Sequence, residues 1–211
     1  MAQYLAIHPR NPQARLVRAA ADIVAKGGVI VYPTDSSYAL GCALENKEGR
    51  DRICRLRDLD EKHPFTLVCR DLSDLATYAQ VENSAYRILR AHTPGPYTFV
   101  LPATREVPRR LLDPKRRTIG LRVPDHVVAQ ALLAQLGAPL MSVTLILPGE
   151  EGPLGDPHDI RERLEHVVDV VIDGGPCPGD TTSVVVWEDQ EFRVHRAGMG
   201  ETSMFAPHRG D

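Results

Sequence analysis

Residues 29–41 read VIVYPTDSSYALG, an apolar run that breaks at Pro33 into a polar loop. The loop presents five side chains that can hydrogen-bond, residues 34–38. In open α/β sheets ligands bind beyond the carboxyl ends of strands, so a polar loop at such a point predicts a small-molecule pocket. A proline-initiated turn is the alternative, because Pro, Asp and Ser favour turns for backbone reasons alone.

The size and composition of the chain predict one domain over residues 1–211. With 211 residues, 43% hydrophobic and 25% charged, it has the values of an ordinary globular protein, and no linker divides it. No apolar run approaches the length needed to cross a membrane. The first residues do not have the pattern of a signal peptide, which is a positively charged segment followed by an apolar core and a cleavage site of small residues. We therefore expect a cytoplasmic protein without a membrane partner, and a frayed tail over residues 204–211.

Hydrophobic periodicity predicts helices and strands that alternate, although not strictly. Asn11 is expected to cap a first helix that Gly27 and Gly28 end, and Asp159 to cap a late one. Further helices are predicted at 51–57, 72–78, 85–91 and 127–136. Strands are predicted at 29–32, 65–69, 97–101, 118–123, 140–147 and 167–172, with a hairpin of 182–187 and 192–195 and a surface loop at 148–158. This order favours a single α/β domain with a mixed sheet.

The sequence contains no motif with the spacing of a metal or nucleophilic site. Both types of glycine-rich phosphate loop are absent, and the eight histidines are scattered. The four cysteines are widely spaced, which favours reduced thiols over a zinc site: Cys42, Cys54, Cys69 and Cys177. We predict no metal ligand.

Charge is concentrated locally, although the formal net charge is only −3. Between Arg105 and Arg122, seven cations face only Glu106 and Asp113. Residues 47–70 hold further arginines among several acids. Such clusters suit the phosphates of a nucleotide or of an RNA backbone, and a solvated helix face is the alternative.

Several separate motifs, in order, resemble the YrdC/YciO family. They are residues 28–41, 94–101 (PGPYTFVL), 118–126 (TIGLRVPDH), 173–175 and 196–198. The resemblance extends over a core of about residues 15–200. It implies a YrdC-like fold, with a twisted mixed sheet, helices packed around it and a positively charged concave pocket.

The resemblance also implies an activity. Many members of the family are threonylcarbamoyl-AMP synthases, nucleotidyltransferases that join L-threonine, bicarbonate and ATP, with Mg²⁺, into threonylcarbamoyl-adenylate and pyrophosphate. This is the first step of the threonylcarbamoyladenosine (t6A) modification of tRNA, which involves partner proteins. Other members are associated with binding double-stranded RNA.

Roles carry over from the family to individual positions. The resemblance implies substrate contacts at Thr34, Tyr38, Arg122 and Thr182. It implies nucleotide contacts at Arg57, Thr118, Ser142 and Arg196. The catalytic positions that the resemblance implies are Arg57, Ser142 and Thr144.

The chain departs from the family at three of its signature positions. The Lys-x-Arg signature falls on Arg57, Asp58 and Leu59, so the second cation is lost, and the Asn of Ser-x-Asn is Thr144. A family histidine falls on Val68. A lost charged contact costs about 2–4 kcal/mol of transition-state stabilisation, or roughly a hundredfold in rate. These departures resemble the YciO branch, and Arg55, Lys62 or His63 are candidates to compensate.

Three hypotheses follow. The first is a threonylcarbamoyl-AMP synthase-like enzyme whose activity is weaker than that of the YrdC branch or is directed to another amino acid or acyl acceptor. The second is a tRNA- or double-stranded-RNA-binding protein that uses the basic segments 50–57 and 105–122 and makes no adenylate. The third gives Thr34, Arg57 and Arg122 a purely structural role.

Overall fold

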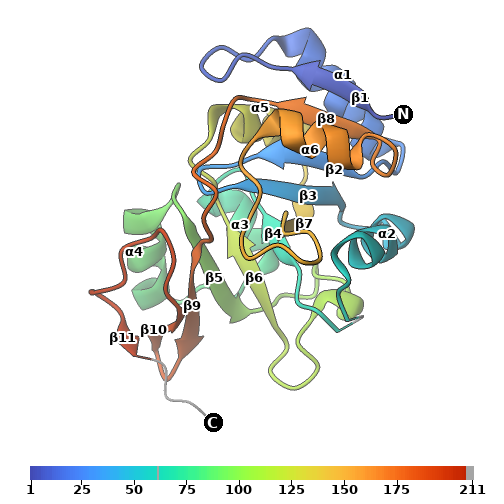
Figure 1. Ribbon diagram of the computed structural model, residues 1–211. Helices are drawn as coiled ribbons and strands as arrows, with labels where there is room; N and C mark the ends of the chain where they lie inside the picture. Colours follow the sequence, from blue (N-terminus) through green and yellow to red (C-terminus); the bar gives the residue numbers. More distant parts are fainter. Residues whose placement is uncertain (61, 208–211) are drawn as a thin grey trace.

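One mixed sheet of eleven strands runs through the computed structural model, which describes residues 1–60 and 62–207 (Figure 1). The strands are β1 (Gln3–Ala6), β2 (Ile30–Pro33), β3 (Tyr38–Ala43), β4 (Thr66–Val68), β5 (Tyr97–Pro102), β6 (Thr118–Arg122), β7 (Leu140–Thr144), β8 (Val170–Asp173), β9 (Ser183–Glu188), β10 (Glu191–Arg196) and β11 (Ala206–Pro207). Their order is β1-β8-β2-β3-β7-β4-β6-β5-β9-β10-β11. Parallel pairs such as β1–β8 and β4–β6 stand beside antiparallel ones such as β2–β3 and β5–β6, so the predicted mixed α/β sheet is confirmed.

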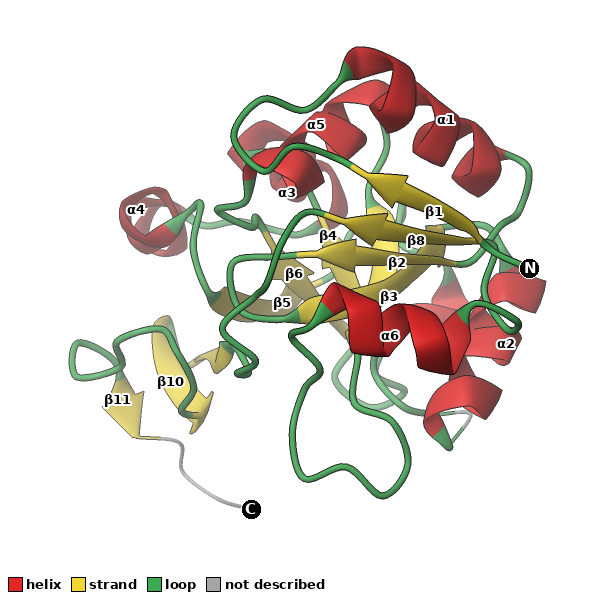
Figure 2. Ribbon diagram, turned by 45° about the horizontal axis from the view of Figure 1, so that its top comes forward, coloured by secondary structure: helices red, strands yellow, loops and turns green. Residues whose placement is uncertain are grey.

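The described residues form six α-helices, which pack against the sheet. They are α1 (Ala14–Ala25), α2 (Lys47–Arg57), α3 (Leu72–Tyr78), α4 (Asn83–His92), α5 (Val127–Leu136) and α6 (Pro157–Leu164), and a short 3₁₀ turn, η1, spans Arg109–Leu111. Figure 2 shows α1 and α5 side by side on one side of β1, β8 and β2, with α6 on the other side. The helices thus bury both faces of this part of the sheet.

Side chains alternate between two apolar clusters because successive residues of a strand point to opposite faces. Ile30 and Tyr32 of β2 pack with α1 and α5, whereas Val31 joins a larger cluster that includes residues of α2, α3, α4 and α6. β2 is buried along its whole length, which explains the unbroken apolar run in its sequence.

α1 and α5 cover only part of the sheet face on which they pack. Val68 of β4 and Leu140 of β7 belong to the cluster under these helices. Thr66 and Ser142 lie two residues away on the same strands, hence on the same face, but they line a cavity instead. Beyond α1 and α5 this face of the sheet is therefore open.

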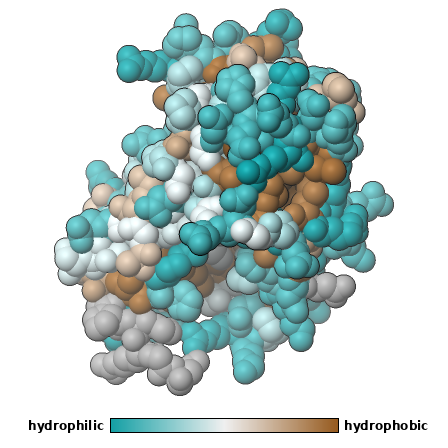
Figure 3. All heavy atoms as spheres, in the orientation of Figure 1, coloured by the Kyte–Doolittle hydropathy of each residue, from teal (hydrophilic) through white to brown (hydrophobic). Residues whose placement is uncertain are grey.

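The face of the molecule seen in Figure 3 is mainly polar. Hydrophilic residues cover most of this face, and one group of apolar residues lies in a hollowed area (Figure 3). In the part of the chain that the structure describes, no helix is long and apolar enough to cross a membrane.

The polar loop after β2 is a tight hairpin turn. β2 and β3 pair antiparallel with Pro33 opposite Tyr38, and the Thr34 amide donates to the Ser37 carbonyl (3.1 Å). β3 was not predicted as a separate strand, because the polar residues at its start are typical of a loop. Residues 34–37 therefore form a turn, as the second interpretation of this segment predicts.

Two predicted helix caps were wrong. The Asn11 amide instead donates to His8 Nδ1 (3.1 Å) in a separate turn, and α1 begins after Gln13 without a side-chain cap. α6 is capped by Asp156, whose carboxylate accepts from the amides of His158 and Asp159, because Pro157 provides a favourable first helical residue.

Several predicted boundaries also moved. α2 starts at Lys47 rather than at 51, because Asn46 accepts a bond from the Gly49 amide and caps the helix there. The strand predicted at 140–147 ends at Thr144, where β7 stops pairing with β3. The described part of the predicted tail packs on the fold: Phe205 is buried and β11 pairs with β10, whereas residues 208–211 lie outside the described residues.

Candidate functional site

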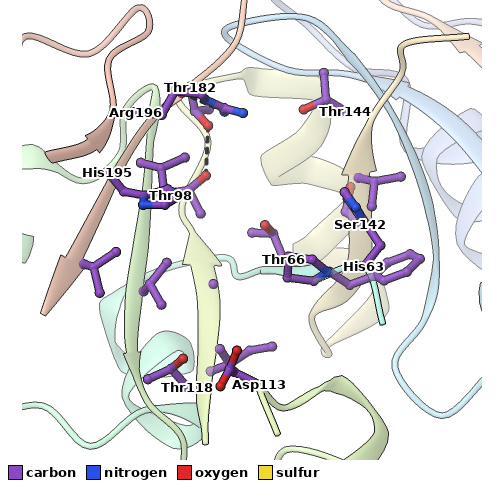
Figure 4. Close-up of a pocket in the computed structure, with 18 of the residues that line it drawn as sticks. His63, Thr66, Thr98, Asp113, Thr118, Ser142, Thr144, Thr182, His195 and Arg196 are labelled. Atoms are coloured by element: carbon purple, nitrogen blue, oxygen red, sulfur yellow. Dashed lines mark hydrogen bonds between the residues drawn. The ribbon is translucent and has the colours of Figure 1, made fainter. Parts of the chain in front are cut away.

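A cavity of about 520 Å³ opens over β7, β4, β6, β5 and β9. The end of α2 and the residues around the 113–118 turn form its walls (Figure 4). This volume is typical of sites for small molecules and cofactors.

The floor of the cavity exists because small side chains meet across the central strands. Thr66 of β4 stands opposite Gly120 of β6 on one side and Ser142 of β7 on the other. A Cβ on Gly120 would lie 3.2 Å from Thr66 Oγ1 and 3.3 Å from Cγ2 of Thr98. Any larger residue at position 120 would therefore fill the hollow.

Hydroxyl groups of the floor are held by hydrogen bonds. Ser142 Oγ donates to the Leu40 carbonyl (3.0 Å) and thus accepts from Tyr32 Oη (2.8 Å). The hydroxyls of Thr98 and Thr182 bond each other (2.9 Å) across β5 and the start of β9 (Figure 4). Burial raises the pKa of Tyr32 to about 12, so its phenol remains a neutral donor.

Two guanidinium groups reach the cavity without a carboxylate partner among residues 1–60 and 62–207. Arg57, at the end of α2, donates from Nη1 to the Thr144 carbonyl, and its buried Nε has no hydrogen-bond partner there. Arg196, which is more exposed, donates to the Thr182 carbonyl (3.0 Å). Burial lowers the pKa of both groups, because each cation loses hydration that no nearby carboxylate replaces in full. Both groups can bind an anion.

Three other ionisable groups of the cavity, His63, Arg116 and Asp113, bear on its charge. Burial, and then the charges of Arg57 and Arg50, lower the pKa of His63, so its imidazole is neutral at pH 7. Arg116 forms an ion pair with Glu188, and Asp113 is the single carboxylate among the described lining residues. The cavity thus has more cations than anions.

Six of the nine positions predicted from the sequence line this cavity. They are Arg57, Thr118, Ser142, Thr144, Thr182 and Arg196. They come from four different elements, α2, β6, β7 and β10, and from the loop before β9, so only the folded sheet brings them together. Their individual roles stay predictions.

Three predicted positions, Thr34, Tyr38 and Arg122, lie outside the lining. Arg122 is buried, and its Nη2 donates to Thr34 Oγ1 (3.2 Å), to Ser36 Oγ (2.9 Å) and to the carboxylate of Asp35, with which it forms an ion pair. Its charge is therefore neutralised within the protein. Arg122 holds the β2–β3 turn in this structure.

Tyr38 is likewise engaged in the fold. Its hydroxyl donates to the Gly175 carbonyl (2.8 Å) and accepts from the Gly174 amide (3.2 Å). The Asp173–Gly175 motif begins at the last residue of β8, so the side chain of Tyr38 links β3 to the chain just beyond β8.

The structure also places the positions that depart from the family pattern. Leu59 packs against the larger apolar cluster, and Val68 is buried under α1 and α5, away from the cavity. Of the three candidates for compensation, His63 lines the cavity, whereas Arg55 and Lys62 are absent from its lining.

Sequence reasoning missed several lining residues. Thr66 and Thr98 on the strands, Asp113 on the turn and His195 on β10 were not singled out. The signal that could have found Thr66 and Thr98 is a hydroxyl within an otherwise buried strand. No pattern in the neighbouring sequence indicates that Asp113 or His195 lines a cavity.

Three arginines of the basic stretch 105–122 form ion pairs with carboxylates from other parts of the chain. Arg110 pairs with Glu45, Arg116 with Glu188 and Arg122 with Asp35. The surplus of cations on the surface is therefore smaller than the sequence suggests.

The described cysteines are thiols, with Cys42, Cys54 and Cys69 buried and Cys177 partly so. Within the described ranges no three His, Cys, Asp or Glu side chains gather as metal ligands. His208 lies outside these ranges.

Comparison with known proteins identifies the family. The Sua5_yciO_yrdC family model, described as telomere recombination, matches residues 22–198. The chain belongs to the Sua5/YciO/YrdC family. This confirms the resemblance found in the sequence.

Members with different names share this fold. The uncharacterized protein YciO of Escherichia coli (strain K12) is 53% identical over 205 residues, which are 97% of this chain and 100% of YciO. The crystal structure of E. coli YciO superposes with a TM-score of 0.93 over the same shares.

The synthases are more distant relatives. The threonylcarbamoyl-AMP synthase of Idiomarina loihiensis is 32% identical over 180 residues, 82% of this chain and 95% of that protein. P. abyssi Sua5, crystallised in complex with L-threonine, has a TM-score of 0.88 at 20% identity, covering 98% of this chain and 63% of Sua5. At that identity the likeness shows the fold alone. The relation to threonylcarbamoyl-AMP synthases supports a related function for this chain.

Proposed function

We propose that this chain is a threonylcarbamoyl-AMP synthase-like enzyme that binds ATP in the cavity and forms a carbamoyl-adenylate and pyrophosphate from ATP, bicarbonate and an amino acid, L-threonine in the first instance. The product would serve the threonylcarbamoyl modification of tRNA in the cytoplasm, together with partner proteins of that pathway. Support comes from the relationship to the Idiomarina synthase and from the chemistry of the cavity.

The observation that carries the proposal is the pair Arg57 and Arg196. Two guanidiniums without a carboxylate partner in the described chain stand at the edges of a floor of hydroxyls. Guanidinium forks match phosphate oxygens, and their bonds to phosphate are stronger than those between neutral groups. A triphosphate is the ligand that this set suits best.

The residues would act mainly by positioning and by stabilising charge. In the proposed reaction the amine of the amino acid captures carbon dioxide as a carbamate, whose oxygen attacks the α-phosphorus and expels pyrophosphate. Arg57 and Arg196 would hold the phosphates, and the hydroxyls of Ser142, Thr144 and Thr182 would orient them. Negative charge develops on the phosphates as the bond to pyrophosphate breaks, so these donors favour the transition state.

Magnesium enters this proposal as part of MgATP. The described lining offers a single carboxylate, Asp113, which does not form a cation cage, so we assign no step to a metal held by the protein. Thr34, Tyr38 and Arg122 would act indirectly, by fixing β3 and the turn that precedes it. Leu59 provides no second cation, and we expect slow turnover for that reason.

Pyrophosphate release from ATP tests the proposal. The purified protein is assayed with bicarbonate and Mg²⁺, with L-threonine and then with each other amino acid. Arg57→Ala is compared with Arg55→Ala, a matched control on the exposed side of the same helix.

Release that depends on one amino acid, and that is lost in Arg57→Ala but kept in Arg55→Ala, would support the proposal. Release that is absent with all amino acids would contradict it, and so would equal loss in both variants. Salt-dependent binding of duplex RNA without pyrophosphate release would favour the RNA-binding hypothesis instead.

A further inference from the structure

The cavity changes character along its strands. At one end, Thr98 and Thr182 bring hydroxyls together. Two residues further along β5 and on the same face lies Val100, which stands opposite Val186 of β9, so the lining becomes aliphatic within about 7 Å. Leu111 of η1 adds to this aliphatic surface. The polar end suits phosphates, and the aliphatic end suits the faces of a flat ring.

A carboxylate stands at the aliphatic end. Figure 4 shows Asp113 beside Thr118, at the opposite end of the cavity from Thr144 and Thr182. The Asp113 amide donates to the Thr118 carbonyl (3.1 Å), which closes the 113–118 turn and fixes the backbone of Asp113. Within residues 1–60 and 62–207, charge therefore runs from two guanidiniums that have no carboxylate partner, Arg57 and Arg196, to the carboxylate of Asp113 at the other end.

One oxygen of this carboxylate is already used by the turn. Asp113 Oδ1 accepts from the amides of Lys115 (2.9 Å) and Arg116 (2.6 Å). Among the residues that the structure describes, none donates a hydrogen bond to Oδ2, which is therefore available to a ligand. An ionised carboxylate only accepts hydrogen bonds, so it selects a ligand that has a donor at this point.

We infer that Asp113 determines which base the cavity accepts, by taking a hydrogen bond from an exocyclic amino group at the edge of the ring, as adenine offers. This inference rests on the proposed function, since it assumes that a nucleotide binds with its phosphates toward Arg57 and Arg196. It goes beyond that proposal by assigning base selection to one residue.

The test compares ATP with purine riboside triphosphate, which lacks the amino group and is otherwise the same. Binding to the full chain is measured by isothermal titration calorimetry. We expect ATP to bind about tenfold more tightly, the scale of one hydrogen bond to a partly exposed charged group.

Asp113→Asn is the informative variant. The amide oxygen of asparagine can still accept from Lys115 and Arg116, so the turn is kept, but its amino group then faces the ligand as a donor. The preference for ATP should fall to about onefold or below. Glu188→Gln is the matched control. It removes the carboxylate that pairs with Arg116, and Glu188 itself does not line the cavity, so this variant should keep the preference for ATP over purine riboside triphosphate.

Each other outcome overturns the inference. Equal binding of the two nucleotides by the unmodified chain would do so while leaving the proposed function intact. A preference that persists in folded Asp113→Asn would assign base selection to other residues. Failure of both nucleotides to bind would remove the proposed function together with the inference. If Asp113→Asn does not fold, the comparison of the two nucleotides on the unmodified chain can still overturn the inference, because equal binding would exclude selection through the exocyclic amino group.

Discussion

Replacing Asp35 by asparagine would leave the guanidinium of Arg122 buried without its carboxylate. The side chains of Arg122 and Asp35 are only 7% and 11% exposed. Breaking a buried pair on one side costs about 3–5 kcal/mol, and because asparagine still offers an oxygen, we expect the lower end, about 3 kcal/mol. For a chain of this length, each kcal/mol lowers Tm by about 2–4 °C, so Tm should fall by roughly 6–12 °C.

Thermal unfolding followed by circular dichroism measures this effect. Asp125→Asn is the matched control, an exposed carboxylate three residues beyond Arg122, and should change stability by no more than about 0.5 kcal/mol. The double variant Asp35→Asn, Arg122→Met should be about as stable as Asp35→Asn alone or more stable, because removing the second charge removes the uncompensated cation.

If Asp35→Asn keeps its Tm within about 1 °C, the pair does not hold the turn in place. If it keeps its Tm and loses affinity for ATP or the amino acid, Arg122 and its carboxylate belong to the binding site, as the sequence suggested. Additive losses in the double variant would likewise show that the two groups act separately.

Three further results are expected. Gly198→Ala would put a Cβ 2.4 Å from the main-chain carbonyl oxygen of Thr181, so this variant should unfold at a lower urea concentration. In Gly152→Ala, the control, the added Cβ has no atom within 4 Å, so its urea unfolding should match that of the unmodified chain. Burial holds the pKa of His126 below its ordinary 6.5, so the unfolded chain takes up this proton first as pH falls. The contribution of His126 to the free energy of unfolding should therefore be constant above about pH 6.5 and decline below it. His126→Gln should reduce the loss of stability between about pH 7.5 and 5.5, measured from the urea midpoints at the two pH values. Arg57→Lys keeps the charge but loses the planar fork, so calorimetry should show weaker ATP binding, by about tenfold; unchanged affinity would mean that the cation acts only as a point charge.

Local patterns in the sequence predicted most elements of the fold. α3 and α5 lie at their predicted residues, and the β9–β10 hairpin forms near its predicted place. Each of these elements carries its own signal, apolar spacing or a terminal glycine such as Gly137, whose φ of +65° ends α5. The family motifs added the architecture, and the comparisons confirm the family.

The arrangement of the site was only partly accessible in this way. Arg57, Ser142 and Arg196 were identified by resemblance to family motifs and do line one cavity. Arg122 was identified in the same way, yet Asp35 neutralises it outside the lining. A motif marks a position without its surroundings, and whether an arginine meets a carboxylate or an empty space depends on elements far apart in the chain.

By itself, the sequence determined the family, the α/β class and the cationic residues that a phosphate ligand would need. Only the tertiary structure decided which of these cations remain unpaired, because pairing depends on distances across the sheet. The tertiary structure also decided where the cavity lies. It is open where α1 and α5 stop covering the sheet and where Gly120, Thr66 and Ser142 lie side by side on three strands. That register arises from strands far apart in sequence, so no local pattern encodes it.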